Sequence, residues 1–166
     1  MAYMDKLIIV QSIFIGIIST AFMDVIAWIL RALFKISPMN YAFIGRWFLS
    51  WKDRKFSHNT IVQSPSKKGE TICGWGIHYL TGVIWTLIYL VLNKFYVFNY
   101  SFISVFIFAV LTTFVSFTMI QPALGFGFFA KKMPNQMMSI QNSLVAHIAF
   151  GCGLYLSLNL FIHQLT

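Results

Sequence analysis

The chain has 166 residues, of which 58% are hydrophobic, 18% aromatic and only 10% charged, and its mean hydropathy is +0.75. No soluble domain of this size can hide that much apolar surface, so we expect residues 1–166 to form a single membrane domain. The net charge of +8 does not indicate nucleic-acid binding, because the basic residues stand in short segments between apolar runs, where they set topology and contact anionic lipid head groups.

The first apolar run covers residues 7–30 and contains one acid, Asp24. At about 1.5 Å per residue it makes a helix of about 36 Å, longer than the bilayer core of about 30 Å, so it is predicted to span. A carboxyl group at this depth costs a few kcal/mol and must find partners. Ser12, Gly16, Thr20 and Asp24 recur every fourth residue, so they form one stripe that faces protein rather than lipid.

A long connection at residues 31–71 follows, and its first part predicts an amphipathic helix. The segment at 40–56, NYAFIGRWFLSWKDRKF, places most of its aromatic residues on one side of a helix and its charged residues on the other, with Phe43 as an exception. This pattern is typical of a helix that lies in the membrane interface. The polar stretch at 57–70 is predicted to be an irregular loop because it contains Pro65 and Gly69.

Three further spans are predicted by apolar runs at residues 72–92, 102–120 and 139–162. The second span contains His78 and the fourth contains His147, so both place an imidazole inside the bilayer. The connection at 121–138 begins with Gln121 and Pro122. A kink is expected there, because proline removes a backbone hydrogen-bond donor. The fold class is therefore all-α, an integral membrane bundle of four transmembrane helices with an amphipathic helix in the first connection.

Basic residues set the predicted topology. The connections at 31–71 and 121–138 hold ten of the twelve lysines and arginines, whereas the opposite side has only Lys6 and Lys94. By the positive-inside rule both connections are cytoplasmic, and both termini are expected outside the cytoplasm, in the periplasm of a bacterium.

This topology predicts a polar layer inside the membrane. Asp24, His78 and His147 each lie about 9 to 12 Å from the cytoplasmic end of their helices, by the helical rise. Gln121 ends the third helix on the same side. All four helices are thus expected to send a polar group to one level near the cytoplasmic leaflet.

Three interpretations of this layer remain open. In the first, Asp24 accepts hydrogen bonds from one or both histidines and only holds the helices together. In the second, the layer is a proton or solute site, in which a histidine titrates near neutral pH. In the third, Asp24, His78 and His147 bind a transition metal such as zinc or iron, since two imidazoles and a carboxylate are a permissible ligand set. No other cofactor is indicated.

Several short motifs occur together along the chain: MD at 23–24, NYAFIGRW at 40–47, Phe56 with His58, GE at 69–70, GWGIHY at 74–79, MIQPALGFGFF at 119–129 and SLVAHIAFGCGLY at 143–155. Jointly they resemble a family of small bacterial inner-membrane proteins catalogued as domain of unknown function 2938. The resemblance covers nearly the whole chain, and it implies a four-helix protein of the bacterial inner membrane with no established activity.

The resemblance also directs attention to polar residues on the cytoplasmic side, for which interfacial anchoring or loop capping is favoured over ligand contact. These residues are Asn40, Arg46, His58, Glu70 and Asn135. Arg46 is expected to pair with Glu70 or with a lipid phosphate.

As a function we favour a small transporter, or a transport subunit, for a proton-coupled solute. A homo-oligomer is expected if a solute crosses, because four short helices enclose little volume. One alternative is a membrane-embedded enzyme or metal-binding redox protein, although the sequence favours a non-enzymatic role. A further alternative is a structural or regulatory membrane subunit.

Overall fold

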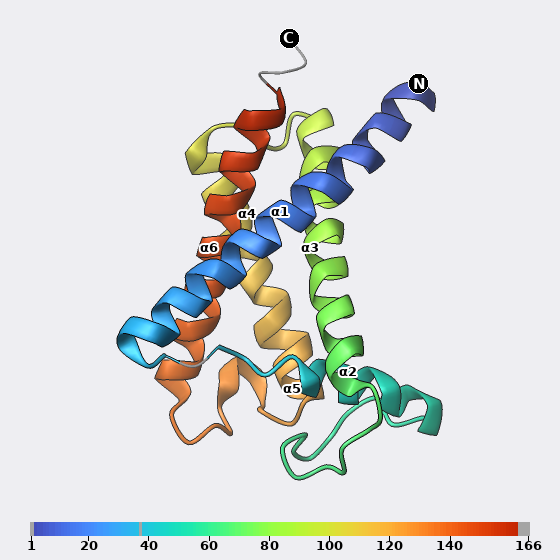
Figure 1. Ribbon diagram of the computed structural model, residues 1–166, viewed down its shortest axis with the longest axis vertical. Coiled ribbons are helices and arrows are strands. Elements are labelled where there is room, and N and C mark those ends of the chain that lie inside the picture. The colour runs from blue at the N-terminus through green and yellow to red at the C-terminus, as the bar shows by residue number, and fades with distance from the viewer. Residues whose placement is uncertain (1, 37, 163–166) are drawn as a thin grey trace.

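A computed structural model of the chain describes residues 2–36 and 38–162 (Figure 1). Within these residues, four long helical segments run alternately up and down, and there is no β-strand. They are α1 (Ala2–Phe34), α3 (Glu70–Lys94), α4 (Phe102–Val115) with its continuation, and α6 (Gln136–Ile162). All four are long and apolar enough to cross a membrane, which confirms the four helices predicted at 7–30, 72–92, 102–120 and 139–162.

Each helix extends beyond its predicted apolar run, because polar residues at the ends also continue the helical hydrogen bonding. The third helix shows the largest departure from a regular form. After α4 it passes through a π-helical turn, η2 (Ser116–Ile120), and a short α5 (Gln121–Ala123). Pro122 has no N–H group to donate, so the widened turn lies where the sequence predicts a kink.

The connection after α1 contains α2 (Ala42–Leu49) and a 3-10 turn, η1 (Ser50–Asp53). The helix is therefore shorter than the predicted 40–56. It passes into η1 at Ser50, and η1 ends at Arg54, which adopts a left-handed conformation with φ of 57° and donates its N–H to the carbonyl of Trp51. The Trp47 indole N–H donates to the carbonyl of Phe56, which holds the chain after the turn against α2.

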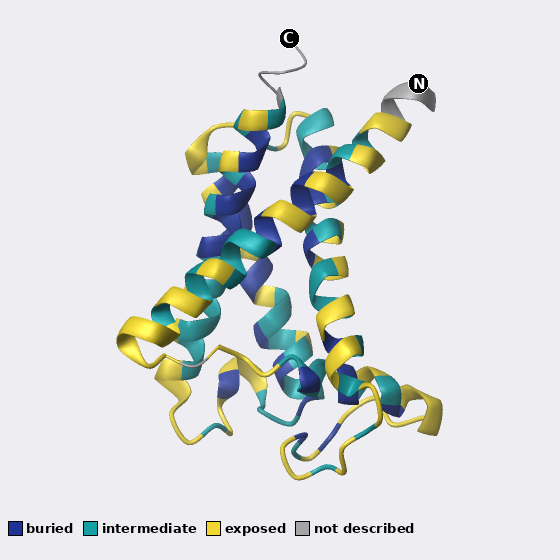
Figure 2. Ribbon diagram, in the orientation of Figure 1, coloured by how far each residue is buried: buried dark blue, intermediate teal, exposed yellow. Residues whose placement is uncertain are grey.

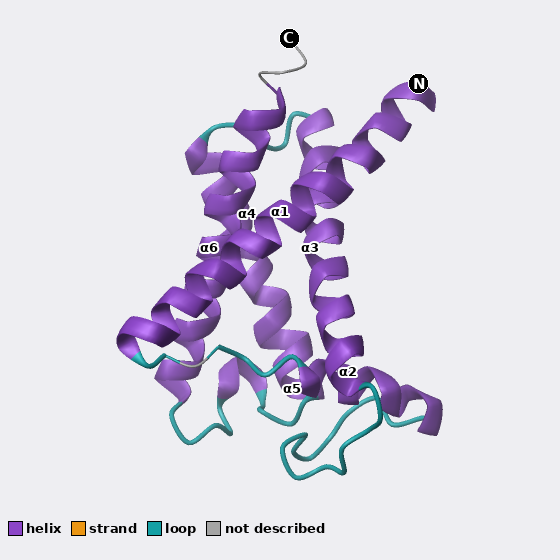
Figure 3. Cartoon of the chain, viewed as in Figure 1, coloured by secondary structure: helices purple, strands orange, loops and turns teal. Residues whose placement is uncertain are grey.

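The apolar core lies toward the end of the bundle where α1 begins. Tyr89, Val105, Leu154 and Leu158 are fully buried there, and Figure 2 shows the buried residues gathered in that half. Figure 3 shows the two long connections at the opposite end, where they form a layer of loops and short helices. The bundle is thus tightly packed at one end and covered by the connections at the other.

Helix α1 crosses the bundle diagonally, beginning beside α3 and ending beside α6 (Figure 1). Small residues permit both contacts. A Cβ at Gly16 would lie 2.6 Å from the Cα of Val83 on α3, and a Cβ at Gly153 of α6 would lie 3.0 Å from the Cα of Ser19. The predicted small-residue stripe of α1 therefore faces protein.

Candidate functional site

Asp24 and His78 form an ion-pair-type contact between α1 and α3. The Asp24 Oδ1 atom lies 3.0 Å from the His78 Nε2 atom, and the two side chains are 19% and 9% exposed. The second carboxylate oxygen, Oδ2, is buried and has no hydrogen-bond partner among the described residues. The side chain of Tyr79, one residue after His78, also interacts with the Asp24 carboxylate.

Aromatic rings enclose the His78 imidazole. Tyr41 stacks on it with ring centroids 3.9 Å apart and planes 20° apart. Trp75 and Tyr79 approach the imidazole edge-on, at 5.7 and 5.5 Å. These three rings and the Asp24 carboxylate together leave the His78 side chain only 9% exposed.

The phenol of Tyr41 stays protonated at neutral pH. Its pKa is raised far above its ordinary value, mainly by burial and secondly by the negative charge of Asp24. Tyr41 therefore contributes an aromatic face and an O–H group to the site, not a second negative charge.

The position of Tyr41 depends on a close contact between α2 and α3. A Cβ on Gly74 would overlap the carbonyl oxygen of Tyr41, and a Cβ on Gly45 would overlap that of Glu70. The two helix backbones can thus touch only because both residues are glycines. This contact brings the start of α2 over His78.

The remaining members of the predicted layer lie apart from the pair. The His147 Nδ1 atom lies 2.7 Å from the Thr112 hydroxyl, and Gln121 is buried with no hydrogen-bond partner for its Oε1 atom in the described residues. No hydrogen bond or ion pair in the described part of the chain connects His147 or Gln121 to Asp24 or His78. The four side chains of the predicted layer therefore do not form one cluster among the described residues.

The metal-binding interpretation needs three ligands in reach of one ion. Among the described residues, no group of three His, Cys, Asp or Glu side chains is placed to hold a metal. A site built from Asp24, His78 and His147 would require His147 to leave Thr112. It stays a prediction.

Arg46 of α2 and Glu70 at the start of α3 form a second ion pair. The guanidinium donates to both carboxylate oxygens of Glu70 at 2.8 Å. Of the two partners expected for Arg46, Glu70 or a lipid phosphate, the structure therefore has Glu70. Its Nη1 group also donates to the carbonyls of Ile61 and Ser64, at 3.0 and 2.7 Å. The hydrogen bond to Glu70 raises the pKa of Arg46, so the charge is permanent. One side chain thereby ties α2, α3 and the loop together.

The same loop docks against the end of the third helix. The N–H groups of His58 and Ile61 donate to the carbonyls of Ala123 and Leu124, both at 2.9 Å. His58 is buried, its Nδ1 atom lies 3.0 Å from the Ser64 hydroxyl, and its Nε2 atom has no partner in the described residues. Burial, followed by the positive charges of Lys55, Lys67 and Arg46, lowers the pKa of His58.

The other two candidates, Asn40 and Asn135, accept hydrogen bonds from the backbone at the start of a helix. Asn40 Oδ1 accepts from the N–H of Ala42 at the start of α2, and Asn135 Oδ1 accepts from that of Met138 at the start of α6, both at 3.0 Å. Sequence reasoning missed Tyr41, Trp75 and Thr112 as partners of the histidines. Trp75 and His78 are three residues apart on one helix, a spacing that predicts contact between their side chains.

The arrangement as a whole can hold a proton. It combines one carboxylate, one imidazole and an aromatic enclosure. Proton exchange needs only the first two groups, so it is the chemistry for which this geometry is suited.

Comparison with known proteins identifies a family. The model of a family described as a protein of unknown function (DUF2938) matches residues 13–161. No curated protein and no solved structure matches the chain.

Proposed function

We propose a function from the geometry of the site alone, because this chain belongs to the DUF2938 family, which is described only as proteins of unknown function. The protein is a multi-pass membrane protein that binds and releases a proton at the Asp24–His78 pair. It acts as a small transporter, or as a subunit of one, for a proton-coupled solute.

The membrane placement is supported by the outer surface. Large apolar side chains such as Phe14, Ile103 and Leu160 are 56%, 70% and 66% exposed, which water would disfavour and lipid covers. The exposed rings of Phe48 and Trp51 support an interfacial position for α2 and η1. The basic connections face the cytoplasm by the positive-inside rule, in the bacterial inner membrane that the family resemblance implies.

The observation that carries the proposal is the contact between Asp24 Oδ1 and His78 Nε2. Both side chains are ionisable and lie in helices of membrane-spanning length, where such groups are costly and commonly functional. Histidine is also the type of side chain that exchanges protons near neutral pH.

A single copy offers no open route beyond the site. On the periplasmic side, Tyr89, Val105 and Leu154 are fully buried against one another and close the bundle. We therefore propose a homo-oligomer, in which the remainder of the path runs between copies.

Proton flux into vesicles tests the proposal. Protein is reconstituted in liposomes that contain a pH-sensitive dye, and a potassium diffusion potential drives protons inward. We expect wild type to acidify the interior, and Asp24→Asn to slow this by about a hundredfold or more, as is typical when a proton-transfer group is removed. His147→Gln, which changes a histidine outside the pair, is the matched control and should conduct as wild type does.

Two results would overturn the proposal. One is wild-type flux no faster than that of protein-free liposomes. The other is undiminished flux through Asp24→Asn protein that has inserted normally.

A further inference from the structure

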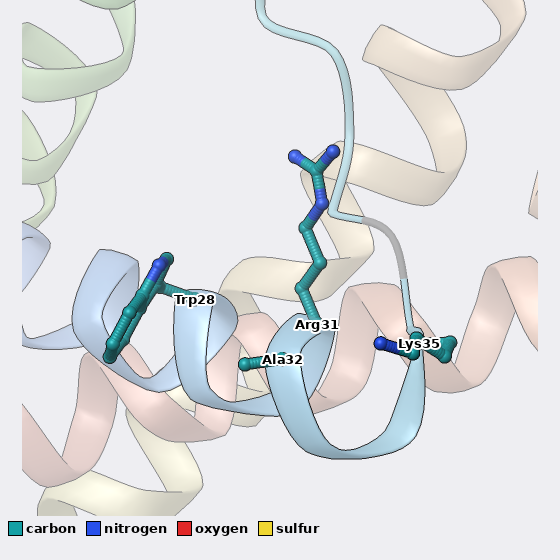
Figure 4. Close-up of a pocket in the computed structure, with 4 residues that line it drawn as sticks. All are labelled: Trp28, Arg31, Ala32 and Lys35. Atoms are coloured by element: carbon teal, nitrogen blue, oxygen red, sulfur yellow. The ribbon is translucent and has the colours of Figure 1, made fainter.

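The last turns of α1 form a groove that the proton site does not use. Trp28, Arg31, Ala32 and Lys35 share one face of the helix and line a groove of about 460 Å³ (Figure 4). Trp28 and Lys35 stand at its two ends, Arg31 extends outward between them, and the small Ala32 leaves space beside it. The groove is thus lined by two cations and an aromatic ring.

Neither cation has a protein partner. Within residues 2–36 and 38–162, the side chains of Arg31 and Lys35 make no hydrogen bond or ion pair. Three of the chain's four acids are occupied elsewhere: Asp24 by His78, Asp53 by Lys67 and Glu70 by Arg46. Two adjacent cations without an acid repel each other unless an anion lies between them.

The backbone turns Lys35 toward the groove. Its φ of 59° is left-handed, and its N–H donates to the Arg31 carbonyl at 3.1 Å, so helical geometry ends at this residue. Glycine is the usual residue in such a position, because a side chain there costs about 1 kcal/mol. Figure 4 shows the Lys35 ammonium pointing back toward Ala32.

The apolar surroundings match a lipid rather than a free anion. Trp28 is 70% exposed, and Leu33 and Phe34 on the neighbouring faces are 69% and 65% exposed. Tryptophan is enriched where acyl chains meet head groups, and arginine and lysine one turn further along reach the phosphate level. A soluble phosphate would use only the cations, whereas a lipid also covers the apolar side chains.

We infer that this groove binds the phosphate of an anionic phospholipid, with Arg31 and Lys35 holding the head group and Trp28 lying against the start of the acyl chains. The inference rests on the membrane placement proposed above, but not on the proton site. Its test therefore uses no flux measurement.

Native mass spectrometry of the detergent-solubilised protein measures how much phosphatidylglycerol, phosphatidylcholine or inorganic phosphate is retained. We expect wild type to retain phosphatidylglycerol in preference to phosphatidylcholine. Arg31→Gln with Lys35→Gln should weaken this retention by about tenfold or more. Lys131→Gln with Lys132→Gln is the matched control, since it removes two exposed cations in the other cytoplasmic connection. This control should retain lipid as wild type does.

A further variant separates lipid binding from folding. Lys35→Gly suits the left-handed backbone, so it keeps or raises thermal stability while it removes one cation, and it should still weaken retention. Three results would overturn the inference. The two double variants could lose lipid retention equally, or the variant without Arg31 and Lys35 could retain lipid as wild type does. The protein could also bind inorganic phosphate without retaining lipid.

Discussion

His58 is the residue whose protonation most directly affects the loop over the site. Its imidazole is buried between the loop and the end of the third helix, and Arg46, Lys55 and Lys67 lie near enough to disfavour a further positive charge. The docked loop therefore favours the neutral imidazole. In this docked state Ile61 of the loop and Leu124 at the end of the third helix are both fully buried.

We predict that acidification destabilises this docked loop. Because the pKa of His58 is lowered from 6.5 in the folded protein, the unfolded chain binds more protons just below that pH. The stabilising contribution is complete above about pH 6.5 and is lost as the pH falls through the lowered pKa. Thermal unfolding between pH 7.5 and pH 5 measures the effect.

His58→Gln is the control, because glutamine has a hydrogen-bonding side chain for Ser64 and does not titrate. Its unfolding temperature should decrease less than that of wild type over the same pH range. An identical decrease in both proteins would contradict the role given to His58.

Depth and charge were enough to suggest two side-chain contacts, whereas the functional role of these residues stays a prediction. Asp24 and His78 lie at one depth on adjacent helices and do meet, and Arg46 found its opposite charge in Glu70. His147 has the same depth but binds Thr112. The helical rise gives height along a helix, whereas the side that faces a given partner depends on how the helices are rotated and crossed.

At the scale of elements, the contact between α2 and α3 positions the aromatic ring over His78. Gly45 and Gly74 remove the side chains that would separate the two backbones. Tyr41 immediately precedes α2, so its stacking depends on that separation.

We predict that Gly74→Ala destabilises the protein by about 1–3 kcal/mol, because the new methyl group meets backbone that must shift. Gly76→Ala, two residues along the same helix, is the matched control. A Cβ there has nothing within 4 Å, so this change should be neutral or stabilise by up to about 1 kcal/mol. Thermal unfolding of the two variants checks the difference, and equal stability would show that the contact is not tight.

The long helices were predictable because hydropathy over about twenty residues is a local property of the chain. The end of α2 was less predictable from the sequence. Residues 50–56 continue the amphipathic pattern, but α2 passes into a 3-10 turn at Ser50, and the left-handed Arg54 ends that turn. The hydrogen bond from Trp47 to Phe56 then holds the chain against α2. Such endings depend on tertiary contacts, which periodicity does not report.

At the scale of the whole molecule, the two ends of the bundle differ. Buried residues gather at one end, around the large aromatic and aliphatic side chains of the core (Figure 2). The two long connections, which carry most of the basic residues, lie at the other end. A site that exchanges protons from the cytoplasmic side requires the connections to face the cytoplasm.

Cysteine labelling measures this orientation. In a background without Cys73 and Cys152, Tyr96→Cys lies in the short turn between α3 and α4, and Ser66→Cys lies in the first long connection. A membrane-impermeant maleimide should label position 96 in intact cells and position 66 only after the membrane is permeabilised. The reverse pattern would contradict the proposed topology.

The most direct test of the central claim is proton flux through four proteins: wild type, Asp24→Asn, His78→Gln and the double variant. If the two residues act as one site, each single change removes most of the flux. The second change then has nothing further to remove, so the double variant conducts as fast as the slower of the two single variants. Independent, additive losses, or a single variant that conducts as wild type does, would contradict the account of Asp24 and His78 as a shared proton site.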